Sequence, residues 1–309
     1  MKAYKDFSTF LQGHFTGKVQ KISIHAGFTC PNRDGRKGFG GCTYCNNQTF
    51  SPEYCRTEKS IGKQLEEGIR FFSHKYPDMQ YLAYFQAYTN TYGELSALKK
   101  KYEEALSHPQ VVGLIIGTRP DCVSEELLDY FEELSTNTFL LIEYGVESTN
   151  EDTLQFIHRG HTYAEAADVI RKTARRGIMT GAHLILGLPK ESKEMILSHA
   201  DKISELPLTT IKLHQLQLIR YTQMAKQFEE HPEWFHLFEV EEYIDLLVDF
   251  VRRLNPDFVI ERFASQSPKE LLIAPDWGLK NYEFTAMVDK RLSTLSNLCK
   301  HPAPPVPPL

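Results

Sequence analysis

The chain has 309 residues, and its 40 Asp and Glu residues against 35 Lys and Arg residues give a formal net charge of -5. With 41% hydrophobic and 24% charged residues it has the composition of an ordinary globular protein, which excludes a fibrous or a fully disordered chain. The acidic excess also argues against wholesale nucleic-acid binding.

Residues 1–18 lack the uninterrupted apolar core of a signal peptide. The apolar runs elsewhere are far shorter than the ~20 residues that a membrane-spanning helix needs. We therefore expect a cytoplasmic protein with no membrane segment. Six cysteines in such a chain favour metal binding, catalysis or burial over a framework of disulfides.

From Lys21 onward the chain repeats a short β-branched or aromatic run, a polar turn and a segment with helical spacing of apolar residues. Strands are expected near 21–24, 81–86, 113–117, 139–146, 179–186 and 210–218. Helices are expected near 61–73, 94–107, 124–134, 163–176 and 192–205, with another after the sixth strand. Because a parallel crossover commonly uses a helix, this alternation predicts an α/β fold with a parallel sheet.

No G-x-G-x-x-G motif follows the first strand, so successive βα units favour a partial (β/α)6 TIM-like barrel over a dinucleotide-binding domain. The helical patterns over 240–254 and 283–298, with an extra strand near 258–263, predict an α-rich C-terminal extension. We expect a barrel over 1–230, the extension over 231–300 and a Pro-rich disordered tail over 301–309. In a barrel of this kind the chemistry collects at the C-terminal ends of the strands.

The loop after the first strand contains three cysteines among several glycines. Eleven residues separate Cys30 from Cys42, and two separate Cys42 from Cys45. A C-x-x-C spacing lets two thiolates reach one metal or cluster from a tight turn. The loop also lies at the end of the barrel where catalysis is expected, so position and chemistry agree.

Three interpretations of these cysteines remain open at this point. A structural zinc ion would need four ligands, and Cys55 is available as the fourth. A set of buried thiols leaves the close C-x-x-C spacing unexplained. A [4Fe-4S] cluster held by Cys30, Cys42 and Cys45 fits a loop that follows the first strand of a βα series, and we favour it over zinc.

The cysteine loop, with Tyr44 directly before its last cysteine, resembles the radical S-adenosylmethionine (SAM) superfamily. Most members have a C-x-x-x-C-x-x-C motif, and the longer first gap here resembles the branch related to the Elongator catalytic subunit, including its bacterial YhcC-like proteins. Further similar segments follow along the chain: GTRPDC at 117–122, EYGVES at 143–148, HRGHT at 158–162 and HLILGLP at 183–189. No acetyltransferase-like domain is expected after the barrel, so acetyl transfer is not implied.

The resemblance implies a barrel of the radical SAM type and an enzyme that cleaves SAM reductively to a 5'-deoxyadenosyl radical. It implies an electron donor such as flavodoxin or ferredoxin. The segment Gln86, Thr89 and Asn90 follows the second strand where relatives receive the SAM amino group, although the glycine-rich motif of those relatives is absent here. By the same resemblance Glu147 contacts the SAM ribose, and Arg159 is placed to hold a carboxylate.

Polar residues on the late strands are candidates for the substrate site, because a buried parallel strand is normally apolar. They are Arg119, His183, Lys212, His214, Gln215, Gln217, Glu261 and Arg262. Glu143 and Glu147 bracket the fourth strand, and at least one of these carboxylates is expected to face a polar cavity. A small-molecule substrate is favoured. RNA stays open as an alternative through the basic groups at 99–101, 171–172 and 175–176, which lie on predicted helices.

Overall fold

The computed structural model describes residues 2–73 and 79–300, without the side chains of residues 48, 50 and 295–300. The tail predicted over 301–309 lies outside the described residues. The strands are β1 Lys5–Asp6, β2 Val19–Ile24, β3 Gln80–Phe85, β4 Val111–Thr118, β5 Phe139–Glu147, β6 Met179–Leu186, β7 Thr210–Gln215, β8 Leu218–Ile219, β9 Val259–Arg262 and β10 Leu272–Ala274.

The helices alternate with these strands. They are α1 Phe7–His14, α2 Ile61–Ser73, α3 Leu95–Leu106, α4 Glu125–Ser135, α5 Glu151–Phe156, α6 Tyr163–Arg175, α7 Lys193–Ser204, α8 Gln223–Glu230, α9 Val240–Arg253 and α10 Asn281–Lys300, with 3-10 turns at Asn47–Phe50, Pro120–Cys122 and Pro232–Trp234. Within the described part of the chain, every helix is too short or too polar to cross a membrane.

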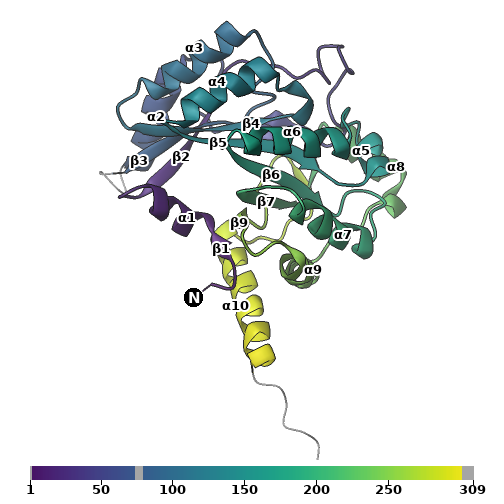
Figure 1. Cartoon of the computed structure of the whole chain (residues 1–309). Helices are drawn as coiled ribbons and strands as arrows, with labels where there is room; N and C mark the ends of the chain where they lie inside the picture. The colour runs from purple at the N-terminus through teal and green to yellow at the C-terminus, as the bar shows by residue number, and fades with distance from the viewer. Residues whose placement is uncertain (1, 74–78, 301–309) are drawn as a thin grey trace, which may run out of the picture.

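Eight parallel strands form one sheet in the order β1-β9-β7-β6-β5-β4-β3-β2 (Figure 1). The predicted α/β fold is therefore confirmed, and the six predicted strands are β2 to β7. The sequence pattern missed β1, because a strand of two residues is too short for periodicity to place. The extra strand expected near 258–263 is β9, but the pattern did not show that it continues the sheet beyond β7.

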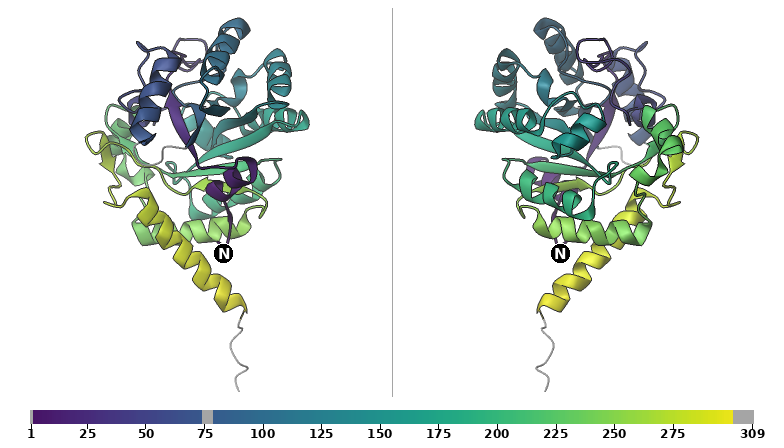
Figure 2. Two further views of the ribbon diagram at one scale, coloured as in Figure 1. Left: turned by 90° about the vertical axis from the view of Figure 1, so that its left-hand side faces the viewer. Right: turned by 90° about the vertical axis from the view of Figure 1, so that its right-hand side faces the viewer.

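The sheet curls into a half-barrel. Strand β2 forms one edge of the sheet, yet Lys21 of β2 forms an ion pair of 2.6 Å with Glu261 of β9, next to the other edge. Only a curled sheet brings these two strands together across its interior. Helices α2 to α7 cover the outer face (Figures 1 and 2). Two of them begin as predicted, since Ser124 caps α4 and Thr162 with Glu165 forms the capping box of α6.

The interior of the half-barrel is layered along the strands because every second residue faces inward. At the N-terminal end, Leu82, Ile115 and Leu141 pack against Leu11 of α1, a helix that the sequence pattern did not predict. The next inward-facing layer toward the C-terminal ends of the strands contains the charged side chains of Lys21, Glu143 and Lys212. An open pocket begins beyond this layer. Helix α1 thus closes one end of the barrel and leaves the other end for chemistry.

The predicted C-terminal helices are α9 and α10, which pack against each other through Tyr243 and Phe284, and Trp277 in the segment before α10 contacts both rings. The strand predicted over 210–218 ends earlier than expected. Its last residue in the sheet is Gln215, and Leu218–Ile219 pairs instead with β10 in a separate two-stranded sheet. The chain leaves the barrel there, at the level of the pocket.

Candidate active site

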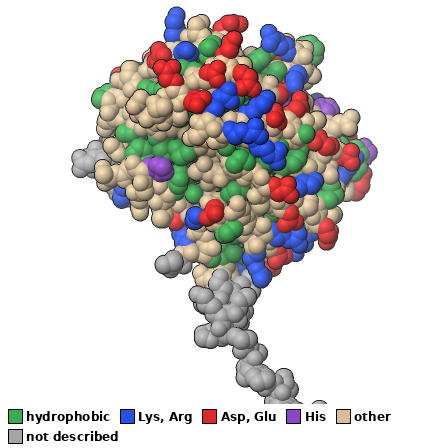
Figure 3. Space-filling view, viewed as in Figure 1, with side chains coloured by type: hydrophobic (Ala, Val, Ile, Leu, Met, Phe, Trp, Pro, Cys, Tyr) green, Lys and Arg blue, Asp and Glu red, His purple; other side chains and the backbone are tan. Residues whose placement is uncertain are grey.

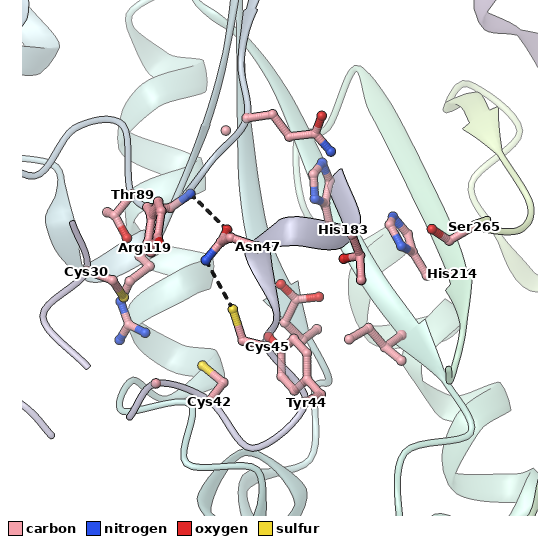
Figure 4. A pocket seen from close by; sticks show the side chains of 18 of the residues that line it. Cys30, Cys42, Tyr44, Cys45, Asn47, Thr89, Arg119, His183, His214 and Ser265 are labelled. Carbon is pink, nitrogen blue, oxygen red and sulfur yellow. Dashed lines mark hydrogen bonds between the residues drawn. The ribbon is translucent and has the colours of Figure 1, made fainter. Parts of the chain in front are cut away.

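One pocket runs across the C-terminal ends of the strands (Figure 4). The cysteine loop lies on one side of it, and His183 of β6 and His214 of β7 lie on the other. Its lining includes Cys30, Cys42, Tyr44, Cys45, Asn47, Gln86, Tyr88, Thr89, Arg119, Glu143, Gly145, Glu147, Arg159, His183, His214, Gln215, Gln217, Arg262 and Ser265. Most of the predicted site residues are therefore brought together.

The cysteine loop is held by its own backbone. The N–H of Cys45 donates to the Cys42 carbonyl at 3.0 Å, and the N–H of Gly41 donates to the Asn32 carbonyl at 2.9 Å. Gly41 has φ +91°, a conformation that a side chain strongly disfavours. The N–H of Thr43 reaches the Ile157 carbonyl at 3.0 Å, which ties the loop to the segment after α5.

Hydrogen-bond donors surround two of the three sulfurs. The Asn32 amide lies 3.4 Å from the Cys42 sulfur, and the Asn47 amide lies 3.6 Å from the Cys45 sulfur. The Arg159 guanidinium lies 3.5 Å from the Cys42 sulfur. The sequence analysis missed both asparagines, although a signal was present: each follows a cysteine of the loop by two residues.

The Cys45 thiol is disfavoured as a thiolate by its surroundings. Burial, and then the neighbouring Cys42, raises the pKa of the Cys45 thiol to about 11. An iron–sulfur cluster removes this penalty because its irons bind thiolates, and N–H donors toward the sulfurs stabilise the negative charge that such a cluster carries. The donor set of Cys30, Cys42 and Cys45 with Asn32 and Asn47 therefore fits a cluster.

Cys55 lies apart from this group. It is buried behind Tyr54, its pKa is raised to about 12 mainly by burial, and it is absent from the lining of the pocket. Among the described residues no three or more His, Cys, Asp and Glu side chains are arranged to hold a single metal ion. The zinc interpretation therefore lacks its fourth ligand in this pocket.

Glu147 and Arg159 form a pair beside the cysteines, with 3.7 Å between their charged atoms. Arg159 also donates to the Gly145 carbonyl at 2.5 Å. A Cβ on Gly145 would lie only 2.5 Å from the Arg159 guanidinium and 2.6 Å from the Glu147 carboxylate, so a side chain there would displace this pair. Glu147 has φ +70°, a costly conformation of the kind found at functional sites.

The segment after β3 reaches the pocket through some of the predicted residues. Gln86 and Thr89 line it, and the side-chain amide oxygen of Gln86 accepts a hydrogen bond from the Ser23 hydroxyl. Tyr88, at φ +63°, donates its N–H to the Asn47 side chain. Asn90 is not among the lining residues: it is buried, and its amide donates to the Phe85 and Gly117 carbonyls, where it joins the ends of β3 and β4.

A buried ionic network forms the floor of the pocket. Glu143 accepts from Lys21 at 3.3 Å, from Lys212 at 2.7 Å and from His183 at 2.8 Å. Burial alone would raise the pKa of Glu143, but these three groups hold it well below its usual range. Lys21 was not expected here, because β2 was treated as an ordinary strand.

The substrate candidates on β6, β7 and β9 gather on one side of the pocket. His183 and His214 face each other with ring centroids 5.9 Å apart, and the Arg262 guanidinium donates to His214 at 2.7 Å. Burial, followed by Arg262, lowers the pKa of His214 well below its usual value.

Alternation along the sixth predicted strand puts Lys212 and His214 on one face and Gln215 and Gln217 on the other, and it does not decide which pair faces inward. Lys212 points inward to Glu143, and His214 lines the pocket. Gln215 and Gln217, predicted on the opposite face, line the pocket as well, because β7 ends at Gln215.

Comparison with known proteins extends over most of the chain. Residues 30–203 match the model of the radical SAM superfamily, and residues 208–294 match its C-terminal domain. The Bacillus subtilis protein YtqA is 34% identical over 94% of this chain and 90% of its own length. The Escherichia coli protein YhcC is 33% identical over 93% of this chain and 91% of its own length.

More distant relatives match a smaller part of their own chains. A tRNA uridine(34) acetyltransferase of Methanocaldococcus jannaschii is 23% identical over 65% of this chain and 36% of its own length. Among solved structures, the Elp3 protein of Methanocaldococcus infernus superposes with a TM-score of 0.68 and 16% identity. That superposition covers 91% of this chain and 64% of the other, and it concerns the fold alone. With matches of this extent, the chain belongs to the radical SAM superfamily of enzymes.

Proposed function

We propose that the chain holds a [4Fe-4S] cluster on Cys30, Cys42 and Cys45 and cleaves SAM reductively to modify or oxidise a small molecule. The observation that carries this proposal is the meeting of three thiols, their N–H donors and the Glu147–Arg159 pair in one pocket. When bound, the cluster supplies one electron that splits SAM into methionine and a 5'-deoxyadenosyl radical able to abstract hydrogen.

The chain's own residues have distinct tasks in this proposal. Asn32 and Asn47 hold the sulfurs by hydrogen bonds, and Arg159 places a positive charge against Cys42. Glu147 accepts hydrogen bonds from the ribose hydroxyls, while Gln86 and Thr89 receive the amino group of SAM. Asn90 supports that loop from behind, since its amide is engaged by two backbone carbonyls.

Two further parts of the proposal concern partners. Flavodoxin or ferredoxin delivers the electron, since the sequence has no flavin or nicotinamide motif.

A small-molecule substrate is supported by the charged floor of the pocket. It is also supported by the ion pairs of Lys172 and Arg176, which join Glu125, Asp129, Glu132 and Asp168 rather than leaving a free basic surface. Figure 3 shows basic and acidic side chains interspersed on this face.

The test of this proposal is SAM cleavage by anaerobically reconstituted protein with a strong reductant, measured as 5'-deoxyadenosine. Glu147→Ala should bind SAM about tenfold to a hundredfold more weakly, because a lost hydrogen bond that leaves a buried partner unsatisfied costs ~1 to 3 kcal/mol. Iron content should stay unchanged. Glu151→Ala, on the exposed start of α5, is the matched control. Equal SAM affinity in wild type and Glu147→Ala would remove Glu147 from the site.

A tRNA substrate is the second candidate, favoured by the similarity to the tRNA uridine(34) acetyltransferase. We expect bulk tRNA not to stimulate SAM cleavage and to bind weakly at physiological salt, because no broad phosphate-tracking surface is evident on the helices. The measurement is 5'-deoxyadenosine release with and without tRNA. A tRNA-dependent rise that disappears when Arg175 and Arg176 are both changed to Glu would establish the tRNA function instead.

A further inference from the structure

The charged floor of the pocket contains a balanced set of four side chains. Lys21 contacts Glu143 at 3.3 Å and Glu261 at 2.6 Å. Lys212 contacts the same two carboxylates, at 2.7 Å and 2.8 Å. Each lysine thus has two acidic partners and each glutamate two basic ones, so the set is closed and carries no net charge.

Arg262 lies next to this set and adds one positive charge. Among the described residues, no carboxylate lies within ion-pair distance of it, and its hydrogen bonds run only from Nη2 to the ring of His214. Its Nε is buried and has no hydrogen-bond partner. A guanidinium beside the strand ends of a barrel, lining the pocket and without a counter-ion, is an incomplete arrangement.

The two histidines beside Arg262 do not supply the missing charge. Burial, followed by Lys212, lowers the pKa of His183, and burial, followed by Arg262, lowers the pKa of His214 well below its usual value, so both shifts favour the neutral rings. The Nε2 atom of His183 is hydrogen-bonded to the Glu143 carboxylate at 2.8 Å. The only charge without a partner on this side of the pocket, within the described part of the chain, is therefore that of Arg262.

We infer that the substrate carries a carboxylate group and that Arg262 binds it, across the pocket from Cys30, Cys42 and Cys45. This inference rests on the proposed function, because it assumes that the pocket shared by the cysteines and Arg262 is a substrate pocket. A planar guanidinium matches a carboxylate with two parallel hydrogen bonds. On the side of the pocket formed by β6, β7 and β9, Arg262 adds one positive charge, which matches the single negative charge of a carboxylate better than the two of a phosphate.

The test measures anion binding directly. Full-length cluster-loaded protein is titrated with acetate, with acetamide as its neutral match and with inorganic phosphate, and binding is followed by broadening of the ligand NMR lines (31P for phosphate). We expect saturable acetate binding, no acetamide binding and weaker phosphate binding. Arg262→Gln should weaken acetate binding about tenfold to a hundredfold, since hydrogen bonds to charged groups contribute ~1.5 to 3 kcal/mol.

Two further variants make the result specific. Arg252→Gln removes the same charge from an exposed position on α9 and should bind acetate as the wild type does. Arg262→Lys keeps the positive charge but loses the paired N–H donors of the guanidinium, so it should bind acetate with intermediate affinity. This variant keeps the test decisive if circular dichroism shows that Arg262→Gln folds poorly. No saturable acetate binding by the wild type, equal binding by Arg262→Gln, or tighter phosphate binding would overturn the inference.

The result of the acetate titration can be distinguished from a failure of the proposed function. Iron content and 5'-deoxyadenosine release are measured on the wild type alone. A wild type that binds acetate through Arg262 but does not cleave SAM keeps the carboxylate site and contradicts the radical SAM reaction. A wild type that cleaves SAM but binds acetate without needing Arg262 contradicts only the carboxylate site.

Discussion

Changing any one of Cys30, Cys42 and Cys45 to Ala should abolish iron binding by the anaerobically reconstituted protein. The wild type should bind about four iron and four sulfide ions, with a broad visible absorption. In the proposed site these three thiolates would hold the cluster together, so the loss of one would leave only two ligands on the loop. Iron and sulfide analysis, together with the visible spectrum, measures the effect.

Cys55→Ala is the matched control for this experiment. Cys55 is buried and free like Cys42, but it lies outside the pocket. Its removal should leave the iron content and the spectrum unchanged. Stoichiometric zinc without iron in protein isolated anaerobically, lost on changing Cys55, would show that the four-ligand zinc site is correct.

The fold was largely readable from the sequence because long βα units carry strong periodic signals. The strands β2 to β7 and the long helices between them were predicted, whereas the short helix α5, Glu151–Phe156, was not. The strand expected near 258–263 is β9, but its place in the sheet beside β7 was not predicted, because that pairing depends on tertiary contacts. Strand β1 and helix α1 were missed. Phe7 of α1 packs over Lys21, whose Nζ lies 4.3 Å from the ring centroid, and no local sequence pattern signals this contact.

The site was readable where chemistry is local in sequence and unreadable where it depends on strand register. The three cysteines are close along the chain, so their spacing was informative. The partnership of Lys21 with Glu143 and Glu261 joins residues more than a hundred positions apart. It exists only because the sheet curls, and no spacing rule connects them. Asn90 was predicted to line the SAM site with its neighbours Gln86 and Thr89. Closeness in sequence was misleading here, because the Asn90 side chain turns back to the strand ends.

Replacing Glu143 by Gln should destabilise the protein by about 3 to 5 kcal/mol at pH 7. Removing one member of a buried ion-pair network leaves its partners with an uncompensated charge. Here Lys212, whose side chain is only 3% exposed, would keep Glu261 alone as its carboxylate partner. Denaturant unfolding of both proteins measures the difference. Glu241→Gln, which removes an exposed ion pair with Arg291 on α10, should cost at most about 1 kcal/mol.

The same variant should show a distinct pH dependence. Because the pKa of Glu143 in the folded protein lies well below the usual 4.5, its ionised form stabilises the fold above pH 4.5, and this contribution is lost as the pH falls toward the folded-state pKa. The free energy of unfolding of the wild type should therefore drop below pH 4.5, while Glu143→Gln, which has no such proton to bind, should drop less. The gap between the two proteins should be largest near neutral pH and narrow on acidification. A gap that stays constant from pH 7 to pH 3 would mean that packing, and not the charge of this carboxylate, makes Glu143 important to the barrel.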